Sequence, residues 1–311
     1  MTSESPTAQI PPDPRPSRPL VAAVIVTYHP DAGIVDRIAA LPNQVDAIVV
    51  VDNGSTEDEL RPLLDLGGDR IASFVRNGEN IGVASALNVG MDWARVNHYP
   101  WTLLLDQDTT PGPDVVLEAA RVFDAVPSPH PAVISAGWAS GWDVPEPGGP
   151  IVCAITSGAM HSVAAWEALG GFEDRLFIDY VDTEFSLRTR ARGYGVLGVR
   201  RPTIEHVIGH PTRHKTILRS FSVTNHDAMR RYYITRNRIL VWRRYWRRES
   251  GFVAWDITRA VKEFPKMILF EADRRRKVAA VVRGLFDGFR GSGKPPEGLP
   301  VPGAPHGRND S

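Results

Sequence analysis

The chain has 311 residues, a formal net charge of zero, 42% hydrophobic residues and 23% charged residues, as is usual for a globular protein. Its sequence excludes a membrane-spanning helix, because no stretch approaches the ~18 consecutive apolar residues that such a helix needs. It also excludes an intramolecular disulfide, because Cys153 is the single cysteine. We expect one large α/β domain with an appendage, in a reducing, cytoplasmic compartment, since the N-terminus lacks an apolar signal segment.

Charge is distributed unevenly along the chain. The segment from Arg200 to Arg290 holds 22 Lys or Arg residues and 8 Asp or Glu residues, whereas the rest holds 14 and 28. An acidic first part and a basic last part predict two different working surfaces. The segments 1–18 and 291–311 are rich in proline and predict disordered tails.

Between the tails, buried strands alternate with helices. Continuous apolar runs predict strands at 20–28, 46–55, 71–77 and 101–108. Helical spacing or composition predicts helices at 31–41, 57–66 and 80–97. This order predicts a mostly parallel, doubly wound sheet, in which ligands bind at the carboxyl ends of the strands. Polar clusters at three of these ends should therefore meet in one crevice.

The strongest of these clusters is Asp106-Gln107-Asp108, directly after an apolar run. Alternation in an extended chain points both carboxylates to the same side. Mg²⁺ and Mn²⁺ prefer carboxylate and phosphate oxygens, so the pair suits a divalent cation that also binds a diphosphate. The alternative is a loop in which an Asp caps a turn.

Two further clusters lie at the end of the second strand and before the third helix. Asp52, followed by Asn53-Gly54-Ser55, could accept a hydrogen bond from a base or a ribose, or could simply form a turn. Asn80 and Gly82 bracket a tight turn before a helix of small residues. Such a helix N-terminus favours phosphate, and the alternative is close packing of helix on sheet.

Later in the chain, three carboxylates fall within six residues, at Asp179, Asp182 and Glu184. They precede a predicted helix that Asp182 could cap, and such a dense acidic cluster beside apolar residues favours a functional role. The alternative is an N-cap with an ion pair between Glu184 and Arg188. His206, in the segment 204–210, suits either a mixed carboxylate–imidazole metal site or the protein core.

Taken together, these motifs resemble family 2 glycosyltransferases with the GT-A fold. The resemblance runs from Val21 to Tyr245 through TYHP, VDNGS, NxGxAxALNxG, LLLDQD, SGAMHS, FIDYVDTEFSLR, EHVIGH and RRYYITRNRIL. Within the family, the chain is most similar to bacterial rhamnosyltransferases that use dTDP-L-rhamnose. The resemblance implies an inverting enzyme with a Rossmann-like, mostly parallel sheet, a divalent cation (Mg²⁺ or Mn²⁺) and a C-terminal helical appendage.

The resemblance also implies roles for residues at matching positions. Asp182 would be the catalytic base, with Glu184 as the alternative. The nucleotide sugar would contact Thr27, Tyr28, Asp52, Asn80, Gly82, Asp106 and Gln107. The metal would be held by Asp106, Asp108 and His206. The donor sugar or acceptor would lie near Ser157, Gly158, Asp179, Glu184 and Arg188.

We expect a catalytic domain at 19–215 and a basic amphipathic helical region at 216–290, which Pro265 splits. Basic helices with apolar stripes suit an anionic membrane surface, here the inner face of the cell membrane, and a polyprenyl-linked acceptor. Plain packing and a homo-oligomer are the alternatives for residues 230–290. Nucleic acid is not expected, because no binding module is present.

The predicted function is transfer of L-rhamnose from dTDP-L-rhamnose to a hydroxyl of a cell-envelope glycan or a lipid-linked acceptor. A galactofuranosyl or other hexosyl transferase of the same family would share the strand-end motifs. A non-catalytic protein that binds nucleotide sugars is the alternative from another class.

Overall fold

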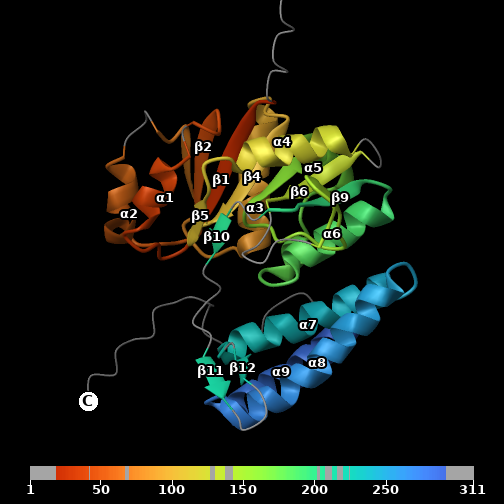
Figure 1. Cartoon of the computed structure of the whole chain (residues 1–311). Coiled ribbons are helices and arrows are strands. Elements are labelled where there is room, and N and C mark those ends of the chain that lie inside the picture. The colour runs from red at the N-terminus through yellow and green to blue at the C-terminus, as the bar shows by residue number, and fades with distance from the viewer. Residues whose placement is uncertain are drawn as a thin grey trace, which may run out of the picture.

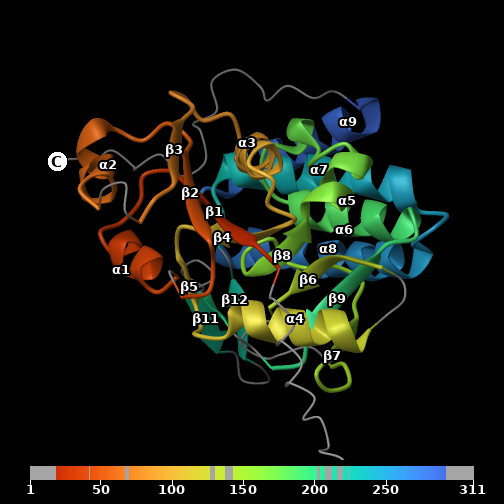
Figure 2. The same cartoon turned by 90° about the horizontal axis from the view of Figure 1, so that it is seen from above.

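The computed structural model describes residues 19–41, 43–66, 70–126, 130–136, 143–201, 204–206, 212–215, 220–223 and 225–291. Within these ranges, a mixed sheet of eight strands carries helices on both faces, and three long helices form a layer beside it (Figures 1 and 2). The predicted tails, apart from Gly291, lie outside the described residues.

The strands of the main sheet lie in the order β3-β2-β1-β4-β8-β6-β9-β7. In chain order they are β1 (Val21–Thr27), β2 (Ala47–Asp52), β3 (Ser73–Arg76), β4 (Trp101–Asp106), β6 (Pro131–Ser135), β7 (Gly148–Pro150), β8 (Ala159–Ser162) and β9 (Gly195–Val199). β1 pairs in parallel with both β2 and β4, which confirms the mostly parallel sheet. β8 and β7 run antiparallel to their neighbours.

The core lies in two layers, one on each face of the sheet. Alternate residues of β1 enter opposite layers: Ala23 and Ile25 pack with α1 and α2, while Ala22 and Val24 pack with α3. The helices on the first face are α1 (Ile34–Ala39), α2 (Glu57–Leu64) and α4 (Val115–Ala125). Those on the second are α3 (Val83–Val96), α5 (Val163–Leu169) and α6 (Val181–Ala191). A strand buried on both sides explains the continuous apolar run of the sequence.

The first turn of α6 differs from the sequence prediction. The residue at the N-cap is Tyr180, with a left-handed backbone (φ 63°), and Asp182 lies inside the first turn. Its carboxylate accepts from the backbone N–H of Thr183, so it still satisfies one of the unpaired amides of the helix N-terminus. The prediction that Asp182 caps the helix is therefore wrong in position.

The C-terminal layer consists of α7 (Ala228–Tyr245), α8 (Ser250–Phe270) and α9 (Arg274–Arg290). The prediction that Pro265 separates two helices is wrong, because α8 runs through it and the break comes at 271–273. Pro265 has no backbone N–H to donate to the carbonyl of Val261, four residues earlier. Val261 is 67% exposed, so this carbonyl lies on the outer side of the helix. Among the described residues, no helix combines the length and apolar character needed to cross a membrane.

Two short strand pairs link the sheet to this layer. β5 (Thr109–Pro111) pairs with β10 (Ile204–His206), and β11 (Thr212–Lys215) pairs with β12 (Ser220–Val223). The expected domain boundary after residue 215 falls between β11 and β12, and the division into two domains stays a prediction.

Candidate functional site

A cavity of about 1030 Å³ lies between the end of β4, the start of α6 and the helices α7 and α8. Its polar wall includes Asp106, Asp179, Asp182, Thr183, His226 and Arg230. Its apolar wall includes Pro150, Ile151, Ile234, Phe252 and Trp255. The cavity thus joins predicted site residues of the catalytic fold to residues of the C-terminal layer.

The ends of β1, β2 and β4 meet as the sequence predicts. The hydroxyl of Thr27 donates to Asp52 at 3.1 Å, and the side-chain amide of Gln107 donates to the carbonyl of Tyr28 at 3.1 Å and accepts from its N–H at 2.7 Å. These contacts fasten neighbouring strand ends to each other. The three clusters therefore lie together at one edge of the sheet, and of their residues Asp106 lines the cavity, so a common crevice stays a prediction.

Asp52 is engaged within its own turn. The side chain is 1% exposed and accepts from the N–H groups of Gly54 and Ser55, from the hydroxyl of Ser55 and from Thr27. The turn that the sequence offered as the alternative role of Asp52 is thus present in the structure. Contact with a nucleoside stays a prediction, and it would require the carboxylate to share or exchange one of these partners.

Ser157 fixes the strand end that carries the acidic pair. Its hydroxyl oxygen accepts from the N–H of Asp106 at 2.8 Å, lies 2.6 Å from the hydroxyl of Thr109 and is 1% exposed as a residue. Gly158 has a φ of +76°, and a Cβ there would lie 2.7 Å from Ile204. The geometry explains both residues as supports of the site.

The strand that follows the acidic pair is paired with the strand that carries His206. In the antiparallel pair of β10 and β5, His206 lies across from Thr109, the residue after Asp108. Asp106 lines the cavity and Asp108 is exposed. The side chain of His206 lies outside the described residues, and among the described ones no group of three potential metal ligands occurs. Two carboxylates and an imidazole are a donor set that suits Mg²⁺ or Mn²⁺.

The N-terminus of α3 is already occupied by protein. The carbonyl of Phe177 accepts from the N–H of Val83 at 2.6 Å, and a Cβ on Gly82 would lie 2.6 Å from the ring of Phe177. Asn80 accepts from Asn53 and from the N–H of Gly82. The expected contact of Asn80 and Gly82 with a nucleotide stays a prediction. The structure shows that they hold the turn against the loop before α6.

That loop has an unusual backbone. Phe177, Asp179 and Tyr180 all have positive φ angles, between 61° and 64°, although none is a glycine. Each such residue costs of order 1–3 kcal/mol and persists only where the surroundings impose it. The ring of Phe177 stacks on Tyr233 of α7, with ring centres 5.0 Å apart. The strain sits directly before Asp182.

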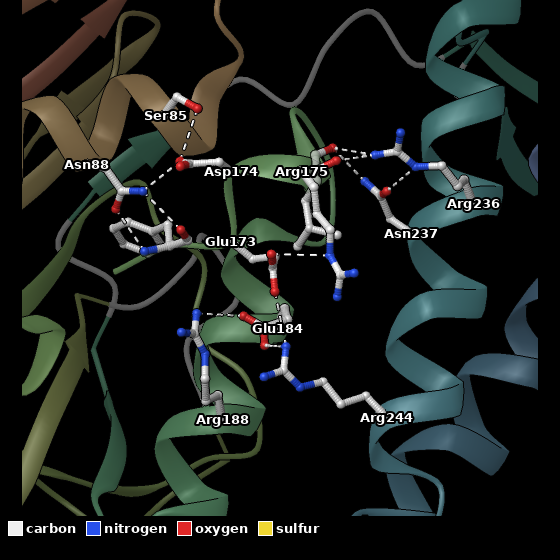
Figure 3. Close-up of polar contacts among 12 residues, drawn as sticks. Ser85, Asn88, Glu173, Asp174, Arg175, Glu184, Arg188, Arg236, Asn237 and Arg244 are labelled. Atoms are coloured by element: carbon white, nitrogen blue, oxygen red, sulfur yellow. Dashed lines mark hydrogen bonds and ion pairs between the residues drawn. The ribbon is translucent and has the colours of Figure 1, made fainter. Parts of the chain in front are cut away.

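Two residues of α7 hold this loop (Figure 3). The buried side-chain amide of Asn237 lies within 2.9 Å of the carbonyls of Leu176, Ile178 and Asp179. Arg236, fully buried, donates to the carbonyl of Arg175 and to Asn237. These residues were missed as site residues in the sequence. The feature of the sequence that could have indicated them is a polar pair, Arg236-Asn237, which follows Tyr232 and Tyr233 in the same helix.

Asp182 lies at the cavity wall, half-buried, with a polar neighbourhood. Its Oδ1 accepts from the N–H and the hydroxyl of Thr183, at 2.6 and 3.2 Å. Burial raises the pKa of its carboxyl above the usual range and the nearby Asp179 adds to the rise, although the Thr183 hydrogen bonds oppose it. A carboxylate with a raised pKa is a better proton acceptor near neutrality.

Glu184 and Arg188 are not brought to the cavity. Glu184 is 2% exposed and bonds to Arg188 at 2.8 Å and to the hydroxyl of Tyr245 at 2.8 Å. Arg244 of α7 lies 3.1 Å from it (Figure 3). The Glu184–Arg188 ion pair is thus the alternative that the sequence offered for this acid. The contacts of Glu184 with Tyr245 and Arg244 tie α6 to α7.

Arg230 of α7 is a cavity residue that the sequence analysis did not single out. Its guanidinium forms an ion pair with Asp179 at 3.1 Å, and the carboxylates of Asp179, Asp227 and Asp106 raise its pKa although burial opposes this. His226, nearby on the same wall, has a pKa lowered to about 3 by burial and by Arg230, so it is neutral. Arg230 therefore brings a fixed positive charge to the acidic end of the cavity.

Comparisons with known proteins agree with this architecture. Residues 22–144 match the family model described as Glycosyl transferase family 2. A protein of Shigella flexneri named dTDP-rhamnosyl transferase RfbF is 29% identical over 244 residues, which are 72% of this chain and 80% of that protein.

Solved structures show the same fold at low identity. The mannosyltransferase PcManGT from Pyrobaculum calidifontis, solved with GDP-Man and Mn²⁺, shares 16% identity over 91% of this chain and 90% of its own, with a TM-score of 0.54. The TarS fragment 1–349 of S. aureus, solved with UDP-GlcNAc, shares 14% identity over 87% and 81%, with a TM-score of 0.55. At these identities the likeness concerns the fold alone.

Proposed function

Since residues 22–144 belong to glycosyl transferase family 2, we propose that the cavity below β4 is the active site of an inverting transferase that moves L-rhamnose from dTDP-L-rhamnose. The acceptor is a hydroxyl group of a cell-envelope glycan or of a lipid-linked glycan. The observation that carries the proposal is that Asp106, the first carboxylate of the acidic pair, and Asp182 line one cavity. The relative from Shigella flexneri supports rhamnose as the donor sugar.

Asp182 is the proposed general base. Its carboxylate takes the proton of the acceptor hydroxyl while that oxygen forms a bond to the anomeric carbon of the donor. The bond from the anomeric carbon to the diphosphate oxygen breaks with its electron pair, and the diphosphate leaves on the opposite face. A single displacement inverts the anomeric configuration, so a β-linked donor gives an α-rhamnoside. The raised pKa of Asp182 suits this role.

Negative charge grows on the leaving diphosphate, and the cavity offers a cation for it. Arg230 lines the cavity and forms an ion pair with Asp179, and its guanidinium would donate to phosphate oxygens of the leaving group. Asp106, Asp108 and His206 would hold a divalent cation. That cation would supply further positive charge for the leaving group.

A panel of nucleotide sugars tests the donor. Thermal unfolding of the full chain is followed with dTDP-rhamnose, UDP-galactofuranose and UDP-GlcNAc, each with Mn²⁺ or Mg²⁺. A ligand at 100 times its dissociation constant stabilises the folded state by about 2.7 kcal/mol. We expect dTDP-rhamnose to give the largest stabilisation. A clear preference for a uridine donor would overturn the rhamnosyl assignment, and no response to any donor would favour a protein that does not bind nucleotide sugars.

A further inference from the structure

Helix α8 has three faces of different chemistry. Its buried face carries Val253, Asp256 and Met267. A second face lines the cavity with Phe252, Trp255, Arg259 and Lys266. At helical spacing, Ile257, Val261 and Phe264 lie on the side of the helix away from the cavity, next to the buried face, and they are 41%, 67% and 41% exposed. The wall of the proposed active site and an uncovered apolar stripe are thus opposite sides of one helix.

Helix α9 repeats this arrangement on the other side of α7 (Figure 2). Its inner face is held close to α7 by two glycines: a Cβ on Gly284 would lie 2.7 Å from the carbonyl of Tyr232, and one on Gly288 would lie 2.7 Å from Ile239. The opposite face exposes Val282, Phe286 and Phe289, by 60%, 50% and 63%. Within the described part of the chain, both apolar stripes face outward.

The charges around these stripes are mostly positive. Arg259 belongs to the cavity face, and the other exposed cationic residues are Lys262 on α8 and Arg274, Arg275, Arg276, Arg283 and Arg290 on α9. The acidic residues within the helices face inward or are ion-paired: Asp256 and Asp287 are buried, and Glu263 pairs with Arg238 and Arg259. An outward surface with apolar rings and cations complements an anionic lipid surface.

We propose that the outer stripes of α8 and α9 bind an anionic lipid bilayer, so that the cavity wall formed by α8 lies close to the membrane. This inference rests on the proposed function, because an acceptor carried on a lipid would then reach the cavity from the membrane. Within α7, Arg231, Arg236 and Arg238 are not part of the contact, since they are buried. A second copy of the chain fits less well, because it would place the same arginines against each other.

The test is co-flotation of the full chain with vesicles of phosphatidylcholine alone or mixed with phosphatidylglycerol. We expect the chain to bind the anionic vesicles, and we expect this binding to weaken as the salt concentration rises. Binding to vesicles of phosphatidylcholine alone should be weaker. The double substitution V261E/F264E should reduce binding by about 100-fold. The matched control is V96E/L117E, which adds the same charge at residues that are 57% and 51% exposed on α3 and α4. All four positions are exposed, so thermal unfolding should stay unchanged.

Three results would overturn the proposal: no binding of the wild type to anionic vesicles, equal loss in both double variants, or a dimer in light scattering that V261E/F264E dissociates. The proposed function fails in a different way, as loss of donor binding in the thermal unfolding panel. V261E/F264E should keep that donor response in full, since its side chains point away from the cavity. The two proposals can therefore fail separately.

Discussion

The side-chain amide of Asn237 donates to the backbone carbonyl of Asp179 at 2.9 Å, across 58 residues of sequence. Asp179 has a left-handed backbone, and it is followed by Tyr180, in the same conformation, and by the helix that carries Asp182. The same amide reaches the carbonyls of Leu176 and Ile178. A helix outside the sheet thus sets the backbone from which the proposed base projects.

Replacing Asn237 by alanine should lower kcat by about 100-fold, because a small displacement of a reacting group has an effect of that size. The KM for the donor should change little, since Asn237 does not line the cavity. Stability should also fall, by about 2 kcal/mol, as buried carbonyls lose their donor. Steady-state kinetics and urea unfolding measure the two effects. The control is N97A, which removes a single exposed hydrogen bond to Trp93. A change in KM alone would argue against a positioning role.

The variant D182N should separate chemistry from folding. Transfer should fall by about 10²–10⁴-fold with the loss of the base. Thermal stability at neutral pH should rise, because burial disfavours the ionised carboxyl and an amide carries no charge. Differential scanning calorimetry and a transfer assay on the same sample give both values. Transfer that survives the substitution would exclude Asp182 as the base.

The pH dependence of transfer and of stability follows from the raised pKa of Asp182. The pKa of Asp182 is raised, so the base becomes protonated and inactive at a higher pH than an ordinary Asp. The ionised form destabilises the fold above that pKa, and this penalty shrinks as the pH falls from the raised pKa to that of an ordinary Asp. We therefore expect transfer to decline on the acid side while the stability gain of D182N shrinks over the same range. In profiles against pH, the acid limb of kcat/KM should fall at the pH where the difference in melting temperature between D182N and the wild type begins to shrink. An acid limb at or below the ordinary Asp range would contradict this.

Glu184, two residues after Asp182, should behave differently when it is replaced. E184Q leaves Arg188 and Arg244 with a weaker partner in a buried network, so unfolding free energy should fall by about 3 kcal/mol. Activity per folded molecule should remain within about threefold of the wild type, because Glu184 does not line the cavity. Chemical denaturation and active-site titration with the donor make the comparison. Loss of kcat with unchanged stability would instead make Glu184 the base.

Removal of divalent metal tests the acidic pair. Chelation should abolish turnover, and Mn²⁺ or Mg²⁺ should restore it in the wild type but not in D108N, because the amide is a weaker ligand for a hard cation. Titration calorimetry of Mn²⁺ with and without dTDP provides a measurement independent of turnover. Full activity in the presence of excess chelator would exclude a metal role for Asp106 and Asp108.

The sequence by itself determined the order of strands and helices and the polar ends of the strands. Strands buried on both faces must be continuous apolar runs, and the chain leaves the sheet where polar residues begin, as at Thr27, Asp52 and Asp106. These features are local, so they can be recognised without knowledge of partners. The ion pair between Glu184 and Arg188 is also local, four residues apart on one helix.

Only the tertiary structure decided which polar side chains line the cavity and which are bonded to other parts of the protein. Whether Asp52 or Glu184 faces a ligand depends on partners such as Thr27 and Tyr245, which lie 25 and 61 residues away in the sequence. The same holds for Pro265, whose missing hydrogen bond does not end α8. Arg230 and Asn237 became site residues because α7 packs beside the loop before α6, a contact between distant segments that spacing along the chain does not encode.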